Sequence, residues 1–221
     1  MKLRAPVVRS LCTDCGVSRM ADPSACGNAC QFIKPNYPMM EQAAHGRSRK
    51  GGDELFFGPF QGMHRARMVK PLDGAQWTGI TTSIAADLLK AGKVQAILTM
   101  VSDSNDRWKP KPALITSASD MDRARGMRMG FAPLLALLEE AQARRFSRLA
   151  VIGIPCQIYA LRKLEDQLGL DRLYVIGTPC SDNTTTENFH RFLSLLDTNP
   201  DNINYLEFRA DYHVELRYYD G

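Results

Sequence analysis

Residues 149–156, LAVIGIPC, return almost unchanged at 173–180 as LYVIGTPC, and this pair of stretches decides the fold. Each is a short apolar run that ends in Gly-x-Pro-Cys, and residues 157–168 between them (QIYALRKLEDQL) have helical spacing. Strand, helix and strand in this order are typical of a βαβ unit with parallel strands. The carboxyl ends of such strands meet at one edge of a sheet, so we expect Cys156 and Cys180 to lie side by side there.

The rest of the chain after residue 76 fits the same class of fold. We predict helices over 80–89, 131–145 and 189–196, a strand over 94–101, and a β-hairpin or strand pair over 204–221. Gly92 and Gly169 stand where helices should end, and Thr184 with Glu187 forms a capping box ahead of the last helix. The sequence therefore predicts an α/β fold with a parallel or mixed sheet and flanking helices.

The chain divides by composition into two parts. Residues 1–50 hold four cysteines, four prolines and little periodicity, which indicates a Cys-rich irregular segment ahead of an α/β domain over 51–221. Gly and basic residues are frequent over 45–75, which is typical of a wrapping or lid segment. Asp220-Gly221 is a typical hairpin turn, so we expect an α/β domain that is incomplete and a chain that is truncated at its C-terminus.

Composition and charge exclude several classes of protein. With 44% hydrophobic and 24% charged residues the chain is globular rather than disordered, and no apolar run reaches membrane-spanning length. The basic N-terminus lacks the apolar core of a secretory signal, so we expect a cytoplasmic protein. Basic patches at 47–50, 65–70, 123–128 and 144–148 form either a solvated face or a dock for an acidic partner. No nucleic-acid-binding motif accompanies them.

Four cysteines near the N-terminus have the spacing of a metal site. Cys12, Cys15, Cys26 and Cys30 are separated by two, ten and three residues. Thiols of a protein without an export signal stay reduced, so the six cysteines of the chain indicate metal ligands or redox centres rather than disulfides. Zinc and a 4Fe-4S cluster both accept four cysteines, and the spacing does not choose between them. Gly16 and Gly27, each beside a cysteine, are expected to allow tight turns.

The two Gly-x-Pro-Cys ends have two explanations. Pro155 and Pro179 fix the backbone just ahead of each thiol, which is a rigid way to present two sulfur atoms to one ligand. The alternative is that Cys156 and Cys180 are unrelated buried residues at the ends of strands.

A run of small and hydroxylic residues leads into the first predicted helix of the α/β domain. Residues 74–89 read GAQWTGITTSIAADLL, and free N–H groups at a helix N-terminus beside small hydroxyls suit a phosphate. Ordinary capping by threonine explains the same pattern without a ligand. Residues 181–183, SDN, follow Cys180 and supply either further polar contacts at the sheet edge or a simple Asx turn.

Several stretches together resemble a known family. They are LCTDCG (11–16), CGNACQFI (26–33), HGRSR (45–49), GAQWTGITTSIA (74–85), SDSNDRWKPKP (102–112), GIPCQIYALRKLE (153–165) and LYVIGTPCSDN (173–183). With them the chain resembles the deazaflavin-dependent (coenzyme F420) hydrogenase and dehydrogenase beta-subunit family over nearly its whole length. Within that family it is similar to the branch of the chlorophyll pathway.

The resemblance implies an oxidoreductase. One activity of the branch is ferredoxin-dependent reduction of the 8-vinyl group of divinyl chlorophyllide or protochlorophyllide, and Pro155 and Pro179 look like the pattern of that reductase. The alternatives are 7-hydroxymethyl chlorophyll a reductase, which tends to carry other residues at these two positions, and a beta subunit that oxidises a deazaflavin. Outside the family, a zinc-stabilised binding module without redox chemistry explains the N-terminal cysteines alone.

The same resemblance implies FAD and two 4Fe-4S clusters in the full-length protein. It places Cys12, Cys15, Cys26 and Cys30 on one cluster, and Cys156 with Cys180 on the other, together with a Cys-x-x-Cys pair beyond the end of this chain. For FAD we expect Thr78, Gly79, Thr81, Thr82 and Ser83, followed by Gln157 and Asn183. Clusters of this kind relay single electrons, and the flavin collects two and passes a hydride.

The partners that the resemblance implies are ferredoxin and a magnesium tetrapyrrole. Ferredoxin is acidic, so a basic face suits its docking and predicts an encounter that slows with salt. The proton donor is not decided, since each of the candidates His45, His64, Tyr159 and Asp182 also has a structural explanation. Contact with the surface of photosynthetic membranes and assembly into a homo-oligomer are compatible with the sequence.

Overall fold

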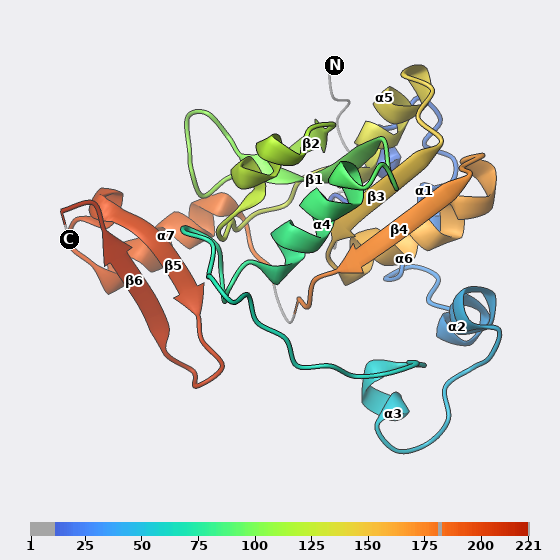
Figure 1. Ribbon diagram of the computed structural model, residues 1–221, viewed down its shortest axis with the longest axis horizontal. Helices are drawn as coiled ribbons and strands as arrows, with labels where there is room; N and C mark the ends of the chain where they lie inside the picture. The colour runs from blue at the N-terminus through green and yellow to red at the C-terminus, as the bar shows by residue number, and fades with distance from the viewer. Residues whose placement is uncertain (1–11, 181–182, 221) are drawn as a thin grey trace.

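A four-stranded mixed sheet lies at the centre of the molecule (Figure 1). The computed structural model describes residues 12–180 and 183–220. The sheet has the order β2-β1-β3-β4, with β1 at Ala96–Ser102, β2 at Pro110–Ile115, β3 at Arg148–Gly153 and β4 at Arg172–Gly177. Strands β1, β3 and β4 are parallel and β2 is antiparallel to β1, so the predicted α/β class with a parallel or mixed sheet is confirmed.

The two copies of the repeated stretch form β3 and β4, which pair in register. Gly153 at the end of β3 lies opposite Gly177 at the end of β4. The amide of Thr178 donates to the carbonyl of Gly153 at 2.9 Å, so the pairing continues past the strands. Helix α6 (Pro155–Leu164) connects the two strands, as the predicted βαβ unit requires.

Helices and short turns cover both faces of the sheet. On one face, side chains of β1 and β3 pack against α5 (Leu137–Ala143) and α6. On the other face, the alternate side chains of the same strands pack against α4 (Ile80–Lys90) and a 3-10 turn at Ala118–Ala124. Because strands buried on both faces carry apolar residues at every position, the repeated stretches have continuous apolar sequences instead of alternating ones.

A second, smaller core forms under a β-hairpin beside the sheet. The hairpin consists of β5 (Ile203–Phe208) and β6 (Val214–Tyr218), and α7 (Thr186–Leu196) packs against it. Trp108, from the connection between β1 and β2, meets Phe189 of α7 edge to face, with ring centroids 5.5 Å apart. This contact joins the hairpin core to the sheet, and the hairpin predicted near the end of the chain is confirmed.

The first part of the N-terminal segment packs on the sheet domain, and the later part of the segment extends away from it. Its described elements are a 3-10 turn at Val17–Arg19, α1 (Cys26–Ala29), α2 (Tyr37–His45) and α3 (Glu54–Phe57). Val17 and Ala29 are buried in the same core as α5 and α6, whereas α2 and α3 form an arm beside the body (Figure 1). The domain boundary expected at residue 50 stays a prediction.

Strand β2 has no counterpart among the predicted strands. Pro110 and Pro112 lie within it, and proline cannot donate to a ladder of hydrogen bonds, which argues against a strand. The structure places β2 at the edge of the sheet, where proline is tolerated. Pairing with β1 across a short connection is what makes the segment a strand.

Two helix starts differ from the prediction. The helix expected over 131–145 begins only at Leu137, because Pro133 and a short 3-10 turn occupy the first residues. The capping residue of α7 is Thr185 rather than Thr184, since the Thr185 hydroxyl accepts a backbone amide of the first turn at 3.1 Å. Both corrections move a boundary and leave the predicted element in place.

Two arginine–glutamate pairs hold the arm of α2 and α3. Arg47 donates to both carboxylate oxygens of Glu54 at 2.5 and 2.7 Å, and the amide of Lys50 donates to the same carboxylate at 2.6 Å. Arg49 binds Glu41 through its side chain and through its amide. The bond from Arg47, followed by that from Lys50, lowers the pKa of Glu54 to about 2.

Acidification is therefore expected to open the arm before the sheet unfolds. A carboxylate with a lowered pKa in the folded state stabilises that state above its ordinary pKa, and the contribution is lost as the pH falls toward 2. Hydrogen exchange of residues 47–57, taken relative to the intrinsic rate at each pH, should lose its protection over this range while β1 and β3 stay protected. In a Glu54→Gln variant the same segment should already exchange rapidly at neutral pH; exchange unchanged from the parent would contradict the role of the pair.

Candidate redox centre

Thiols gather where β3 passes into α6. Cys156 occupies the second position of that helix, and the hydroxyl of Thr13 donates to its Sγ at 3.4 Å from a place 143 residues away in sequence. The thiol of Cys15 interacts electrostatically with those of Cys26, Cys156 and Cys12. The fold therefore brings Cys156 to the N-terminal cysteines.

Burial and crowding control the protonation of these thiols. Burial raises the pKa of Cys15 to about 12; the hydrogen bond from the Val17 amide opposes it in part, and repulsion from the neighbouring cysteines adds smaller increases. Burial and then the proximity of Cys12 and Cys30 raise the pKa of Cys26. A donor set of partly buried sulfur atoms alone fits an iron–sulfur cluster or zinc, either of which holds its thiols deprotonated. Within 12–180 and 183–220, no three His, Cys, Asp or Glu side chains have the arrangement of a formed metal site.

The loop that carries Cys12 and Cys15 is anchored at several points. Asp14, between them, is buried and accepts the Nε of Arg19 at 2.7 Å. Its amide donates to the Sγ of Cys12 at 3.3 Å, and the carbonyl of Cys15 accepts the amide of Leu135 at 2.9 Å. The two thiols are thus fixed relative to the residues that lead into α5.

Gly16 and Gly27 differ, although each stands beside a cysteine. Gly16 has a φ of 111°, and a Cβ there would lie 2.6 Å from the amide nitrogen of Ala136, so the predicted tight turn is confirmed. Gly27 lies inside α1, where no positive φ is recorded and the space for a Cβ is open. The expectation that Gly27 serves a tight turn is wrong, because ordinary helical geometry places it.

The second Gly-x-Pro-Cys end takes a different course from the first. After Gly153 the chain enters α6 with Pro155 at its first position, whereas residues 178–180 after Gly177 are neither helix nor strand. Cys180 is partly buried, as Cys156 is. The assignment of the two to one cluster stays a prediction, and the recorded neighbours of Cys156 favour the N-terminal set.

The residues predicted for the flavin lie around the start of α4. Gly79 caps this helix with a φ of 87°, and its cap shows no side-chain hydrogen bond in the described part of the chain. The Thr78 hydroxyl accepts the amide of Met68 at 3.1 Å, so it is engaged in holding the preceding segment. Thr82 and Ser83 line a cavity of about 250 Å³ together with the side chain of Arg125, and Thr81 is half-buried beside them in the helix.

Gln157 and Asn183 have structural partners. Gln157 is buried; its Oε1 accepts the amide of Ile154 at 3.1 Å and its Nε2 donates to the carbonyl of Ala132 at 3.3 Å. Asn183 exchanges two hydrogen bonds with the backbone of Gly130, at 3.0 and 3.3 Å. Both side-chain amides therefore tie residues 130–132 to the ends of β3 and β4. These hydrogen bonds leave fewer of their donor and acceptor atoms for a flavin.

The candidate proton donors lie in different places. The buried Tyr159 hydroxyl accepts the amide of Asn36 at 2.7 Å and donates to the carbonyl of Lys34 at 3.2 Å, so it fixes the link between α1 and α2. His45 ends α2, and His64 lies in the coil after the arm. Asp182 lies outside the described residues.

One acidic residue escapes the sequence analysis. Glu207 on β5 is buried, and its carboxylate accepts the amide of Trp77 at 3.1 and 3.2 Å and the hydroxyl of Tyr205. The segment predicted to face the flavin is thus anchored on the hairpin. An acid in an alternating strand is ordinarily solvated, so nothing in its sequence pattern distinguishes Glu207.

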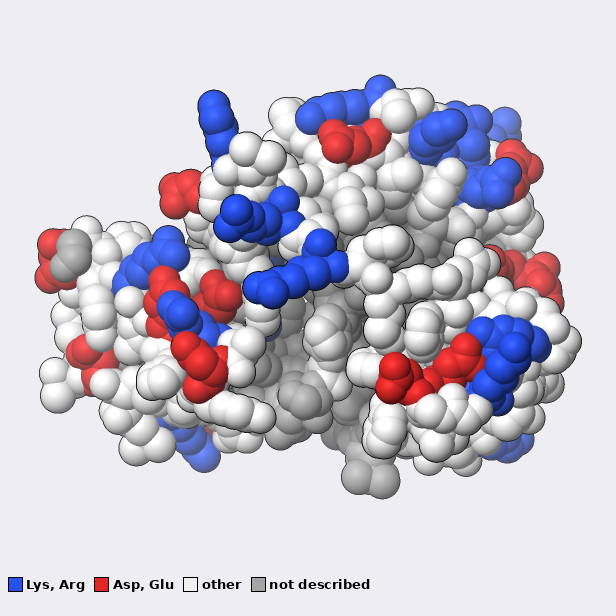
Figure 2. Space-filling view, turned by 60° about the horizontal axis from the view of Figure 1, so that its bottom comes forward, with Lys and Arg blue, Asp and Glu red and all other residues white. Residues whose placement is uncertain are grey.

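The expected basic face is interrupted by acids. Arg47 and Arg49, from one of the basic patches, are paired with Glu54 and Glu41. Figure 2 shows basic and acidic side chains interspersed over one face of the molecule.

Within the described ranges, every helix is too short or too polar to span a bilayer.

Comparison with known proteins gives the context for this arrangement. Residues 63–139 match the family described as coenzyme F420 hydrogenase/dehydrogenase, beta subunit, N-terminal part, and residues 146–220 match the C-terminal part of the same subunit. An uncharacterized protein of Nostoc sp. is 37% identical over 215 residues, which are 96% of this chain and 54% of that protein. The 7-hydroxymethyl chlorophyll a reductase of Oryza sativa is 38% identical over 214 residues, 95% of this chain and 45% of the reductase. The chain thus spans about half the length of these curated relatives.

A solved structure shares the fold. A chain of the F420-reducing [NiFe] hydrogenase complex from Methanosarcina barkeri superposes with a TM-score of 0.57 at 20% sequence identity. The match covers 66% of this chain and 56% of that one. It supports the α/β architecture described above.

Proposed function

Because the chain belongs to the coenzyme F420 hydrogenase/dehydrogenase beta-subunit family, we propose that it is part of an iron–sulfur flavoprotein oxidoreductase. The observation that carries the proposal is the gathering of Cys156 with the N-terminal cysteines at the carboxyl end of β3. That is the edge of an α/β sheet where ligands bind. A zinc-stabilised binding module accounts for the thiols, but it gives no reason for the family match over the sheet domain.

Residues of this chain account for the binding of both groups. The thiols of Cys12, Cys15, Cys26 and Cys30, with Cys156 beside them and Cys180 at the neighbouring strand end, hold iron–sulfur centres. The start of α4 at Gly79, with Thr78, Thr81, Thr82 and Ser83, holds phosphate groups of FAD; Gln157 and Asn183 act mainly by shaping the sheet edge. When bound, iron–sulfur centres and FAD supply one-electron and hydride transfer.

For the reaction, we favour reduction of the 8-vinyl group of a divinyl chlorophyllide or protochlorophyllide, with electrons from reduced ferredoxin. The sequence features that favour it are Pro155 and Pro179 ahead of the two cysteines. The addition of two electrons and two protons across the vinyl group requires a protein proton donor, and of the candidates Tyr159 is already engaged by backbone partners.

A second candidate has its own observation. The relative from rice is named as 7-hydroxymethyl chlorophyll a reductase and matches 95% of this chain, so the same scaffold serves as part of that enzyme. A deazaflavin-oxidising beta subunit is the third candidate within the family. The three differ in substrate and share the cofactors.

The full-length protein, purified without oxygen, is expected to be brown, with flavin absorbance and about eight iron atoms per chain for two 4Fe-4S clusters. The same sample should then reduce divinyl chlorophyllide with reduced ferredoxin, at a rate that falls as salt rises. If the protein turns over only 7-hydroxymethyl chlorophyll a, or only a deazaflavin, then that compound is its substrate and the 8-vinyl assignment is wrong. A colourless protein with one zinc and no flavin would refute the proposed electron transfer.

A further inference from the structure

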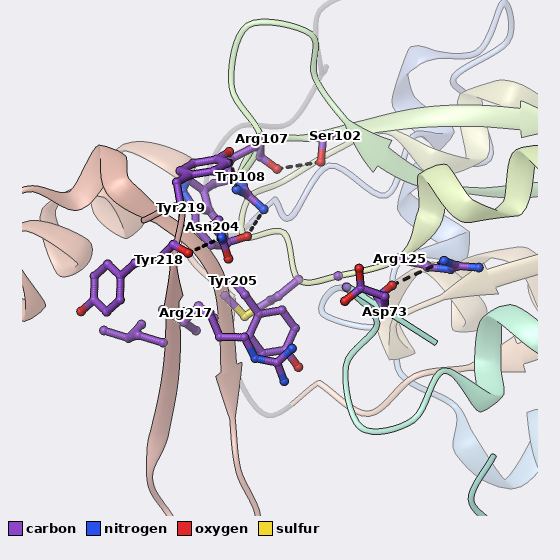
Figure 3. A pocket seen from close by; sticks show the side chains of 15 residues that line it. Asp73, Ser102, Arg107, Trp108, Arg125, Asn204, Tyr205, Arg217, Tyr218 and Tyr219 are labelled. Atoms are coloured by element: carbon purple, nitrogen blue, oxygen red, sulfur yellow. Dashed lines mark hydrogen bonds between the residues drawn. The ribbon is translucent and has the colours of Figure 1, made fainter. Parts of the chain in front are cut away.

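A cavity of about 770 Å³ lies between the connection of β1 to β2 and the β5–β6 hairpin (Figure 3). None of the cysteines lines it, and neither do the hydroxylic residues at the start of α4. Its wall carries three arginines, Arg107, Arg125 and Arg217, against one acid, Asp73. Four aromatic residues also line the cavity: Trp108, Tyr205, Tyr218 and Tyr219.

Arg107 is fixed at the rim of this cavity without an acidic partner among the described residues. Its guanidinium donates to the hydroxyl of Tyr219 at 2.7 Å and to the carbonyl of Asn204. It lies 4.9 Å from the ring centroid of Trp108 and 5.5 Å from that of Tyr219. Aromatic faces and neutral oxygen atoms orient this charge but do not neutralise it.

A second unneutralised arginine lies behind the wall. Arg128 donates its Nε to the hydroxyl of Ser102, which lines the cavity, at 3.1 Å. Its other nitrogens donate to backbone carbonyls of residues 123–126 at 2.6 to 3.2 Å, and within 12–180 and 183–220 no carboxylate lies in ion-pair contact with it. Burial, followed by the proximity of Arg107, lowers its pKa to about 10, so Arg128 is still charged at neutral pH.

The other two arginines of the wall are partly neutralised. Arg217 is paired with Glu215 at 2.8 Å and Arg125 with Asp122 at 2.5 Å. The Nε of Arg125 is nevertheless buried and has no hydrogen-bond partner among the described residues. Asp73 lies beside Arg125, away from Arg107 (Figure 3).

Arg107, exposed at the rim, and Arg128, half-buried behind it, thus make a positive region in which no acid of the described residues pairs with either, and such a region attracts an anion. Guanidinium groups match phosphate oxygens with two parallel hydrogen bonds, and tyrosine and tryptophan rings suit a flat heterocycle. We propose that this cavity binds the phosphate or diphosphate group of a nucleotide-like ligand, through Arg107 at its rim and the field of Arg128 behind Ser102.

The ligand is either a separate nucleotide or the flavin dinucleotide itself, whose diphosphate would then lie here and not at the start of α4. Arg125 lines both this cavity and the smaller one at Thr82 and Ser83, so the two sites adjoin. The inference stands without bound iron or flavin, so it can fail or succeed independently of the proposed function.

Inorganic pyrophosphate is the first probe, titrated into the chain by calorimetry at constant ionic strength, with the melting temperature recorded in parallel. We expect binding, a raised melting temperature, and at least a tenfold weaker Kd in an Arg107→Gln variant. Arg144→Gln is the matched control, because Arg144 is an exposed arginine at the end of α5 paired with Glu140. It should bind pyrophosphate as the parent does.

An Asp73→Asn variant keeps the test decisive if loss of Arg107 loosens the hairpin. Asp73 is exposed, and removal of its charge from the wall should tighten pyrophosphate binding. Titration of FAD into the pyrophosphate complex then separates the two sources: competition assigns the phosphate site to the cofactor, and independent binding assigns it to a separate nucleotide. No pyrophosphate binding by the parent chain, or equal weakening by Arg107→Gln and Arg144→Gln, would overturn the proposal.

Discussion

A Cys156→Ser chain is expected to lose nearly all of the iron that the parent chain takes up when it is reconstituted anaerobically with iron and sulfide. The reason is positional, since Cys156 interacts with the Cys15 thiol and accepts a hydrogen bond from Thr13, within the group formed by the N-terminal cysteines. The parent should bind about four irons per chain and show the visible absorbance of a 4Fe-4S cluster. The variant should show less than about a quarter of that absorbance, because in this arrangement Cys156 takes the place of one of the four N-terminal cysteines as a ligand, and its loss leaves one iron without a thiolate.

Cys180→Ser is the matched control for this experiment. Cys180 also follows Gly-x-Pro and is partly buried, but it lies at the other strand end. Its loss should leave the iron content and the visible spectrum of the reconstituted chain close to those of the parent. If Cys156→Ser keeps its four irons, or if both variants lose iron equally, then Cys156 belongs with Cys180, as the family resemblance alone implies.

Gly16→Ala is expected to destabilise the chain strongly, by about 2–6 kcal/mol of unfolding free energy, since a left-handed backbone and an overpacked contact each cost about 1–3 kcal/mol. Its φ of 111° disfavours any side chain, and the added Cβ would lie 2.6 and 2.7 Å from the amide nitrogens of Ala136 and Leu135. Those atoms belong to the backbone, so they cannot move aside as a flexible side chain does. Urea denaturation followed by circular dichroism measures the loss.

Gly27→Ala provides the comparison, because Gly27 also stands beside a cysteine of the same site. It lies in α1 with open space around it, so alanine there should change stability by less than about 1 kcal/mol, in the stabilising direction. The two substitutions add the same methyl group, and only their backbone settings differ. Similar losses from both would show that the contacts of Gly16 do not limit its replacement.

The centre of the fold was predictable because its information is local. The repeated stretch has an apolar residue at nearly every position, ends in the same turn and encloses a helix, so β3, β4 and α6 followed from a short part of the chain. Strand β2 did not, because its prolines argue against a strand and only the edge position next to β1 admits them. Helix boundaries moved for a similar reason, since a proline and a 3-10 turn set the start of α5.

The candidate site was predictable as a set of residue types but not as an arrangement. Cysteine spacing indicated the N-terminal group. Nothing in that spacing shows that Cys156, which is 143 residues from Thr13 in sequence, lies beside this group in the fold. Likewise, Gln157 and Asn183 follow the strand ends as a ligand-binding residue would, but their partners are the carbonyl of Ala132 and the backbone of Gly130. The segment around residues 116–133 has no strong periodicity, so its contacts, including those of Arg128, come only from the folded chain.

The different courses of the two Gly-x-Pro-Cys ends have an electrochemical consequence. Cys156 lies in the first turn of α6, where the aligned peptide dipoles place partial positive charge, whereas Cys180 follows strand β4 in a stretch, residues 178–180, that is not helical. A positive potential at Cys156 favours the more negative, reduced state of a centre bound there and so raises its midpoint potential relative to a centre bound at Cys180 alone. If centres are bound at both strand ends, as proposed, these two nearly identical sequences would give an electron a preferred direction across the edge of the sheet.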